Sequence, residues 1–184
     1  MNLSILPKNL PIPVDDGKCK HLFNKKIPDI SLPNQDGNLL KLNRKDTFRI
    51  ALYCYPMTGH PKKPLPNNWN NIPGARGCTP QNCSFRDSYD EFLKLNTIPI
   101  GVTTQSIEEI KEMTLRLNIP NDVISDEKYE LINILKLPSF EINKKTYIKR
   151  MTMIIEQSII KHVFYPIFPP DLHVNEVMQW LKNN

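Results

Sequence analysis

Two cysteines, Cys78 and Cys83, lie five residues apart in the segment GCTPQNC at residues 77–83. This segment ends a loop rich in Gly and Pro, and the apolar periodicity that follows predicts a helix over residues 84–93. A cysteine at a helix N-terminus lies beside unpaired backbone N–H groups and the positive end of the helix dipole. Both features favour the thiolate, which is the nucleophilic form of cysteine. The pair therefore indicates redox chemistry rather than packing.

The spacing of the two cysteines restricts when they can bond. Five residues along a helix separate two Cα atoms by roughly 8–9 Å, whereas a disulfide needs Cα atoms within about 7 Å. We therefore expect that Cys78 and Cys83 cannot bond while the helix is intact. If they do bond, the first turn must unwind, so the protein would react in one shape and close its disulfide in another.

Composition and charge exclude several classes of protein. The chain has 184 residues, a length that suits one domain, and a net charge of +5. Its Lys and Arg residues are spread along the sequence without a long basic run or a nucleic-acid-binding motif, so we expect no nucleic-acid partner. No stretch approaches the roughly 20 apolar residues of a membrane span. The cysteines contain no CxxC pair, and the histidines are scattered, so we expect no metal site.

The N-terminus lacks the basic and apolar regions of a signal peptide, which predicts a cytoplasmic protein. In the cytosol cysteines stay reduced unless they are catalytic or redox-sensing. Cys54 lies within an apolar strand and is expected to be a core residue. Cys19 is either a spectator or an extra thiol able to form mixed disulfides.

The order of predicted elements indicates the fold. Residues 1–26 carry several prolines and read as an extended arm, and residues 27–184 read as one domain. Within the domain we predict a β-hairpin over 27–42, strands at 49–55, 98–103 and 123–125, helices at 84–93, 106–118, 130–136 and 171–182, and a second hairpin from 147–156 and 158–165. This order predicts an α/β protein of thioredoxin-like fold, with a central mixed β-sheet flanked by helices.

Residues 73–87 (PGARGCTPQNCSFRD) resemble the active-site segment of peroxiredoxins, in particular the bacterioferritin-comigratory-protein or peroxiredoxin Q type. In that branch the peroxidatic cysteine follows a glycine, and the resolving cysteine comes five residues later. The resemblance runs from about Ile27 to the C-terminus. It includes the sequences IPD at residues 27–29, YP at 55–56 and KRMTMII at 149–155.

The resemblance implies a role for each matching residue. Cys78 would be the peroxidatic nucleophile and Cys83 the resolving thiol. Arg150 would be the active-site arginine beside the thiolate, where its permanent charge and fork of donors suit a developing negative charge. Pro56 would shield the pocket.

Two departures from the family pattern affect the expected pocket. Ala75 replaces a threonine that the family keeps three residues before its nucleophile, and Thr58 is a candidate to supply that hydroxyl. The chain between Pro56 and Cys78 is also longer than the family's loop, with an insert at residues 59–72. The role of this insert is open at this point.

The resemblance implies a thiol peroxidase that reduces hydrogen peroxide or organic hydroperoxides without a metal or organic cofactor. Peroxide would oxidise Cys78 to a sulfenic acid, and Cys83 would condense with it to a disulfide. A dithiol such as thioredoxin would then reduce the exposed disulfide by exchange. Because both cysteines lie in one chain, we expect a monomer.

Three alternatives stay open from sequence. The first is a thiol–disulfide exchange protein on the same fold, although that class normally uses CxxC. The second is a non-enzymatic redox sensor or binding module that docks a partner through the insert. The third is a degenerate family member, because of Ala75. The four histidines are expected at the surface or in loops rather than in catalysis, Trp69 as a loop anchor and Trp180 in the core.

Overall fold

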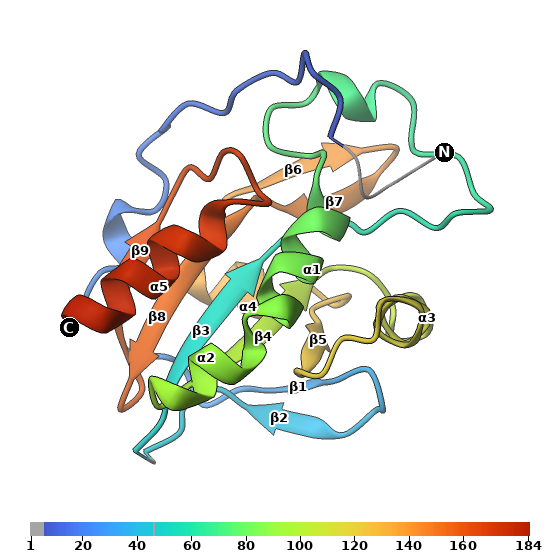
Figure 1. Ribbon diagram of the computed structural model, residues 1–184. Coiled ribbons are helices and arrows are strands. Elements are labelled where there is room, and N and C mark those ends of the chain that lie inside the picture. Colours follow the sequence, from blue (N-terminus) through green and yellow to red (C-terminus); the bar gives the residue numbers. More distant parts are fainter. Residues whose placement is uncertain (1–5, 46) are drawn as a thin grey trace.

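The computed structural model describes residues 6–45 and 47–184. Its centre is a five-stranded mixed sheet in the order β5-β4-β3-β8-β9 (Figure 1). Strands β3, β4 and β5 run parallel, and β8 and β9 are antiparallel to their neighbours. The bounds are Arg49–Cys54 for β3, Thr97–Thr103 for β4, Val123–Ser125 for β5, Met151–Glu156 for β8 and Ile159–Phe164 for β9.

Helices cover both faces of this sheet, which confirms the predicted thioredoxin-like α/β fold. Apolar side chains of four helices pack in one cluster with Ala51 and Tyr53 of β3, and α4 packs in a second cluster with Leu52 and Cys54. Because side chains alternate along a strand, successive β3 residues supply opposite faces. The helices are α1 (Cys78–Asp87), α2 (Tyr89–Lys94), α3 (Ile107–Leu117), α4 (Glu130–Leu135) and α5 (His173–Asn183).

Aromatic packing fixes α1 on the sheet. The ring of Phe85 stacks on Tyr53 of β3 with a centroid distance of 4.1 Å and on Phe92 of α2 at 5.3 Å. All three side chains are fully buried. Cys54 is also fully buried, as predicted for a core residue.

Both predicted hairpins are present, and a third hairpin, which was not predicted, lies between them in sequence. Strands β1 (Ser31–Pro33) and β2 (Leu39–Lys41) form the predicted N-terminal hairpin, and β8 pairs with β9. The expected single strand over 147–156 is wrong, because it is divided between β7 (Lys145–Ile148) and β8. Strand β7 pairs instead with β6 (Ser139–Ile142), and the backbone N–H of Lys149 donates to Pro138 O.

Two helix boundaries differ from the prediction. The helix expected over 84–93 is interrupted at Ser88, which separates α1 from α2, and α1 already begins at Cys78. The last helix begins at His173, two residues after the predicted start. The capping box between Ser106 and Glu109 at the start of α3 is confirmed.

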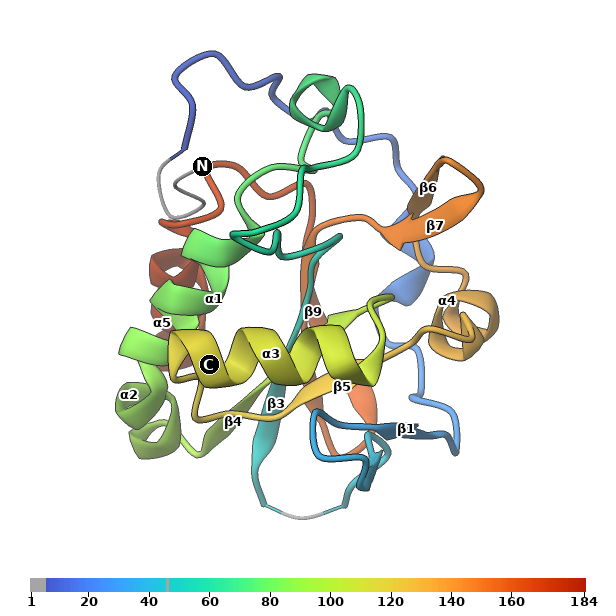
Figure 2. The ribbon, with the colours of Figure 1, turned by 90° about the vertical axis from the view of Figure 1, so that its right-hand side faces the viewer.

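The N-terminal arm lies along the domain (Figures 1 and 2). Leu22, in the 3-10 turn η1 (Lys20–Leu22), is fully buried, and Lys26 forms a β-bridge with Ile159. Cys19 is also buried, with its Sγ 3.9 Å from Met151 Sδ. The division at residue 26 stays a prediction, and residues 1–5 of the predicted arm lie outside the described residues. Across the described part of the chain, no helix has the length and apolar character to cross a membrane.

His173 differs from the expectation of a surface histidine. It is buried at the start of α5, with Nε2 2.9 Å from Thr152 Oγ1 and Nδ1 3.1 Å from Glu176 Oε2. Burial lowers its pKa to about 4, against an opposing effect of Glu176. Since the ordinary value is 6.5, the unfolded chain binds more protons than the folded one between these pH values.

The free energy of unfolding should therefore fall as the pH falls through this window. We expect the His173 contribution to make the protein about 2 kcal/mol less stable at pH 5 than at pH 7. Urea unfolding of wild type and His173→Gln at both pH values measures this, because the variant should lose that part of the pH dependence. The exposed His21 provides the control His21→Gln, which should behave as wild type. An equal pH dependence in wild type and His173→Gln would contradict the prediction.

Candidate active site

Cys78 is the first residue of α1 and is buried, with 2% of its surface exposed. The preceding Gly77 is the N-cap and has a left-handed φ of 102°. A Cβ built on Gly77 would collide with the ring of Pro170 and lie 2.9 Å from Leu6 Cδ2. The helix can therefore start at Cys78 in this position only because residue 77 is a glycine.

The sheet register brings Arg150 to the same place. Met151 at the start of β8 pairs with Cys54 at the end of β3, so Arg150 lies just beyond the carboxyl end of β3. This is the edge at which the chain leaves the sheet toward the loop and α1. The break between β7 and β8 thus frees Arg150 from the sheet ladder and leaves its side chain available for the site.

Arg150 contacts the sulfur of Cys78 directly. Its Nη2 is 3.2 Å from Sγ and also donates to Gly74 O at 3.2 Å and Arg76 O at 3.1 Å. Its Nη1 donates to Gln81 Oε1. A buried guanidinium held by these acceptors stabilises a negative charge on the sulfur and on an oxygen leaving beside it.

Several buried donors near the sulfur have no hydrogen-bond partner among the described residues. They are Nε of Arg150, Nε of Arg76 and Nε2 of Gln81. Burial lowers the pKa of Arg76, and the electrostatic interaction with Cys78 opposes this shift. Because a buried unpartnered donor is costly, this cluster is ready to receive a small molecule that carries acceptor oxygens.

Cys83 lies in the same helix as Cys78, and both are free thiols. Its side chain is half-buried. Burial raises the pKa of the Cys83 thiol. The nearby charges of Arg86 and Arg116 lower this pKa, and the charge of Asp87 raises it. With the helix intact, the five-residue spacing keeps the two sulfur-bearing residues beyond disulfide range.

A buried polar network holds the first turns of α1 in place. Asn82 Nδ2 donates to Cys78 O at 2.9 Å, and Asn82 Oδ1 accepts from the Tyr53 hydroxyl at 3.1 Å. Asn121 Nδ2 in turn donates to the Tyr53 hydroxyl at 2.9 Å. The network links the turn that contains both cysteines to the central strand.

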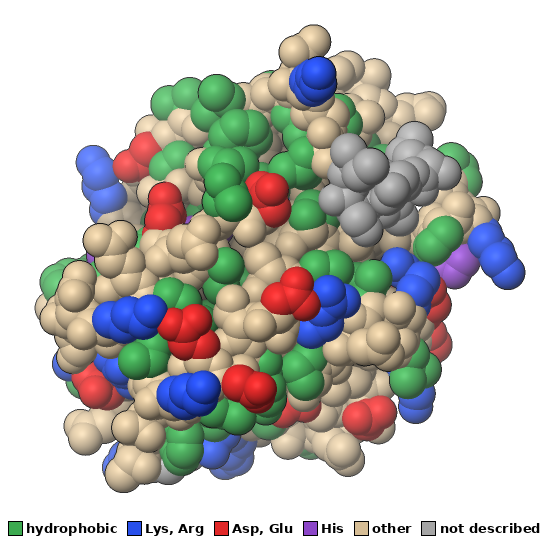
Figure 3. Space-filling view, viewed as in Figure 1, with side chains coloured by type: hydrophobic (Ala, Val, Ile, Leu, Met, Phe, Trp, Pro, Cys, Tyr) green, Lys and Arg blue, Asp and Glu red, His purple; other side chains and the backbone are tan. Residues whose placement is uncertain are grey.

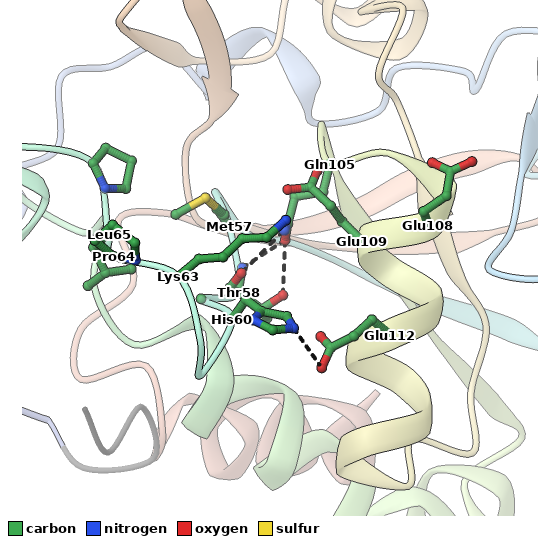
Figure 4. Close-up of a pocket in the computed structure, with 12 residues that line it drawn as sticks. Met57, Thr58, His60, Lys63, Pro64, Leu65, Gln105, Glu108, Glu109 and Glu112 are labelled. Carbon is green, nitrogen blue, oxygen red and sulfur yellow. Dashed lines mark hydrogen bonds and ion pairs between the residues drawn. The ribbon is translucent and has the colours of Figure 1, made fainter.

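The two tentative pocket residues lie in different surroundings. Pro56 is buried just after β3, and its carbonyl accepts from Thr103 Oγ1 at 3.0 Å. Thr58 donates from its backbone N and from Oγ1 to Gln105 Oε1, at 2.8 and 3.0 Å (Figure 4). The structure thus places the Thr58 hydroxyl with Gln105. Ala75 is fully buried, and its carbonyl lies 3.5 Å from Cys78 Sγ.

The insert at residues 59–72 is attached to the domain at both ends. Arg116 of α3 donates to Gly59 O at 3.2 Å, and Trp69 packs edge-on against Tyr147 at 5.0 Å. Trp69 is buried, which confirms it as a loop anchor. Between these points the loop and α3 enclose a pocket of about 300 Å³. His60 and Glu112 both line this pocket and lie next to each other (Figure 4). His60 Nε2 is 3.7 Å from Glu112 Oε1.

The structure brings the predicted residues Cys78 and Arg150 into contact and places Cys83 in the same helix. Arg76 and Gln81 also contact Arg150 and were not predicted. A signal for Gln81 was present, because residues three apart on a helix share a face. Gln81 therefore had to lie on the same side of α1 as Cys78. Among the described residues, no group of three His, Cys, Asp or Glu side chains is placed to hold a metal ion.

Comparison with known proteins identifies the family. The model of the AhpC/TSA family matches residues 70–163, which is just over half of the chain and includes both cysteines and Arg150. The chain belongs to the AhpC/TSA family. Peroxiredoxin Q of Oryza sativa subsp. japonica is 25% identical over 183 residues, covering 96% of this chain and 76% of the relative. Peroxiredoxin Q of Arabidopsis thaliana is 25% identical over 177 residues, covering 92% of this chain and 74% of the relative.

Solved structures agree with the fold. Peroxidoxin BcpB of Mycobacterium tuberculosis superposes with a TM-score of 0.72 at 20% identity, covering 88% of this chain and 96% of that structure. Peroxiredoxin Q of Xanthomonas campestris superposes with a TM-score of 0.67 at 18% identity, covering 95% of this chain and 96% of that structure. The resemblance to peroxiredoxin Q is thus confirmed, and this AhpC/TSA member is a thiol-dependent peroxidase. This finding favours the peroxidase over the exchange protein and the non-enzymatic sensor.

For this AhpC/TSA member, Arg150→Lys should slow oxidation of the Cys78 thiol by hydrogen peroxide on the order of 100-fold. A lysine keeps the charge, but its single ammonium cannot reach Sγ, Gln81 and the two carbonyls together. Stopped-flow measurement of the second-order rate constant tests this, together with the pH profile of Cys78 alkylation.

Arg49→Lys is the matched control. Arg49 Nη2 also donates to two backbone carbonyls, those of Leu95 and Leu181, at 3.0 and 3.3 Å. This control should keep the wild-type rate. A rate within twofold of wild type in a folded Arg150→Lys protein would remove Arg150 from the mechanism.

Proposed function

We propose that Cys78 is the peroxidatic cysteine and Cys83 the resolving cysteine of this peroxidase. The observation that carries the proposal is the 3.2 Å contact between Arg150 Nη2 and Cys78 Sγ at the N-terminus of α1. Helix dipole and guanidinium both face one buried sulfur, which is the arrangement that a thiolate nucleophile needs. The substrates are hydrogen peroxide or organic hydroperoxides. A related protein of Xanthomonas campestris is described as having alkyl peroxide reduction activity.

In the first step the Cys78 thiolate attacks the outer oxygen of the peroxide. A sulfur–oxygen bond forms and the O–O bond breaks, so sulfur is oxidised to a sulfenic acid and the peroxide is reduced. The leaving oxygen takes a proton and departs as water or an alcohol. Arg150, with the unpartnered donors of Arg76 and Gln81, would stabilise the negative charge on that oxygen.

In the second step the Cys83 thiolate attacks the Cys78 sulfur. A disulfide forms, and the hydroxyl of the sulfenic acid leaves with a proton as water. Both residues lie in α1, so the turn between them has to unwind first. Unwinding breaks the hydrogen bonds of Asn82 with Cys78 O and Tyr53.

In the third step an external dithiol such as thioredoxin reduces the disulfide by two thiol–disulfide exchanges and is itself oxidised. The mechanism needs a compartment in which this dithiol is kept reduced. The cytosol meets that requirement, while the names of the plant relatives place those proteins in the chloroplast. The cycle needs one chain only, so we propose a monomer.

Cys83→Ser should separate oxidation from turnover. With thioredoxin, its reductase and NADPH, wild type should consume peroxide repeatedly, whereas Cys83→Ser should consume about one equivalent and then stop, because its sulfenic acid has no partner. NADPH consumption followed at 340 nm, with peroxide measured in parallel, gives the result. Cys54→Ala is the matched control, since Cys54 is buried in the core, and should turn over as wild type. Full turnover by Cys83→Ser would contradict the role of Cys83.

A further inference from the structure

A second crevice, separate from the pocket of Figure 4, opens beside Arg150. It has a volume of about 380 Å³ and is bounded by the arm, the loop before α1 and the segment after β9. Most of its walls are apolar, contributed by Ile12, Pro13, Val14, Ile72, Phe140 and Ile167. Apolar walls around a few polar groups are typical of sites for small organic molecules.

The arm wall of this crevice is held by specific contacts. Asp16 accepts from the Tyr165 hydroxyl and from Lys149 Nζ, each at 2.8 Å. The Lys149 hydrogen bond is the largest cause that lowers the pKa of Asp16 to about 2. Nearby, Pro13 packs over Gly74, where an added Cβ would lie 3.6 Å from Pro13 Cβ. The crevice is thus a built feature of the fold.

Two large apolar side chains of the arm remain exposed at this crevice. Ile12 is 66% exposed and Val14 is 82% exposed. Figure 3 shows apolar side chains gathered along the arm at the upper left of the molecule. Gathered apolar side chains at the mouth of a groove mark a binding surface.

The inner end of the crevice reaches the reacting sulfur through one side chain. Arg150 lines the crevice, is only 3% exposed, and has its Nη2 3.2 Å from Cys78 Sγ. Its Nε has no partner among the described residues. Gly74 also lines the crevice, and its carbonyl holds the same Arg150 Nη2. Arg150 and Gly74 are therefore the residues that this crevice shares with the Cys78 site.

We propose that this crevice binds the hydrocarbon group of an organic hydroperoxide and that Ile12 and Val14 set the preference for such substrates over hydrogen peroxide. The proposal rests on the proposed function of Cys78. Hydrogen peroxide is little larger than a water molecule, which occupies roughly 30 Å³ of liquid. It cannot fill the crevice, and it has no hydrocarbon group to contact the apolar walls. The O–O bond breaks at Cys78 as described above, and the organic product leaves as an alcohol.

The test compares cumene hydroperoxide with hydrogen peroxide. Stopped-flow rate constants for Cys78 oxidation are measured for wild type, Ile12→Asp/Val14→Asp and Ile12→Ala/Val14→Ala. The double Asp variant places charge at the apolar wall and should lower the ratio of the cumene hydroperoxide rate to the hydrogen peroxide rate roughly tenfold. The double Ala variant should lower this ratio less, because it removes apolar contacts without adding charge. Because both side chains are exposed, thermal melting should show folded variants.

Leu115→Asp is the matched control, because Leu115 is 70% exposed on α3, away from the crevice. It should leave the ratio unchanged. An unchanged ratio in both arm variants, with hydrogen peroxide still reacting, would overturn the crevice proposal while leaving the proposed function intact. Loss of thioredoxin-dependent turnover without a change in the ratio would assign the crevice to the reductant and also overturn it. If neither peroxide oxidises Cys78 in wild type, the proposed function itself fails.

Discussion

The contact between the Arg150 guanidinium and the Cys78 sulfur joins the segment before β8 to the first residue of α1. The sulfur reaches it because Gly77 allows α1 to start against Pro170. The guanidinium reaches it because the chain leaves the sheet between β7 and β8. Two carbonyls and Gln81 then fix the arginine. A buried cation in a water-poor site interacts strongly with a negative charge that develops beside it.

The second constraint is the helix itself. The same turn that exposes Cys78 to the helix dipole holds Cys83 too far away to bond. Under the proposed mechanism, oxidation of Cys78 and closure of the disulfide therefore need different conformations of residues 78–83. Asn82 donates to Cys78 O and accepts from the Tyr53 hydroxyl, and these two hydrogen bonds favour the intact helical turn. They are also the contacts whose loss would accompany the change.

The fold class could be predicted because its strands and helices follow from local patterns, while the roles of Cys78 and Cys83 stay predictions. Apolar periodicity predicts the strands β3, β4 and β5, whereas the helix it predicts over residues 84–93 begins earlier, at Cys78. The end of β7 before Arg150 could not be predicted, because the sequence of residues 147–156 suits one continuous strand. The segment is divided only because β7 pairs with β6. The burial of His173 depended on how α5 packs on β8, which no local pattern reveals. Arg76 joins the site only through a tertiary contact, since its carbonyl accepts from Arg150. Gln81 lies three residues after Cys78, so its place on the same face of α1 follows from the spacing.

The most direct test of the account is intact mass spectrometry with thiol counting after one equivalent of hydrogen peroxide. Wild type should lose two thiols and the mass of two hydrogen atoms within one chain. Cys83→Ser should gain one oxygen and lose one thiol, and Cys78→Ser should stay reduced on the same timescale. Oxidation of Cys78→Ser as fast as wild type would show that the reacting thiol lies elsewhere and would contradict the account.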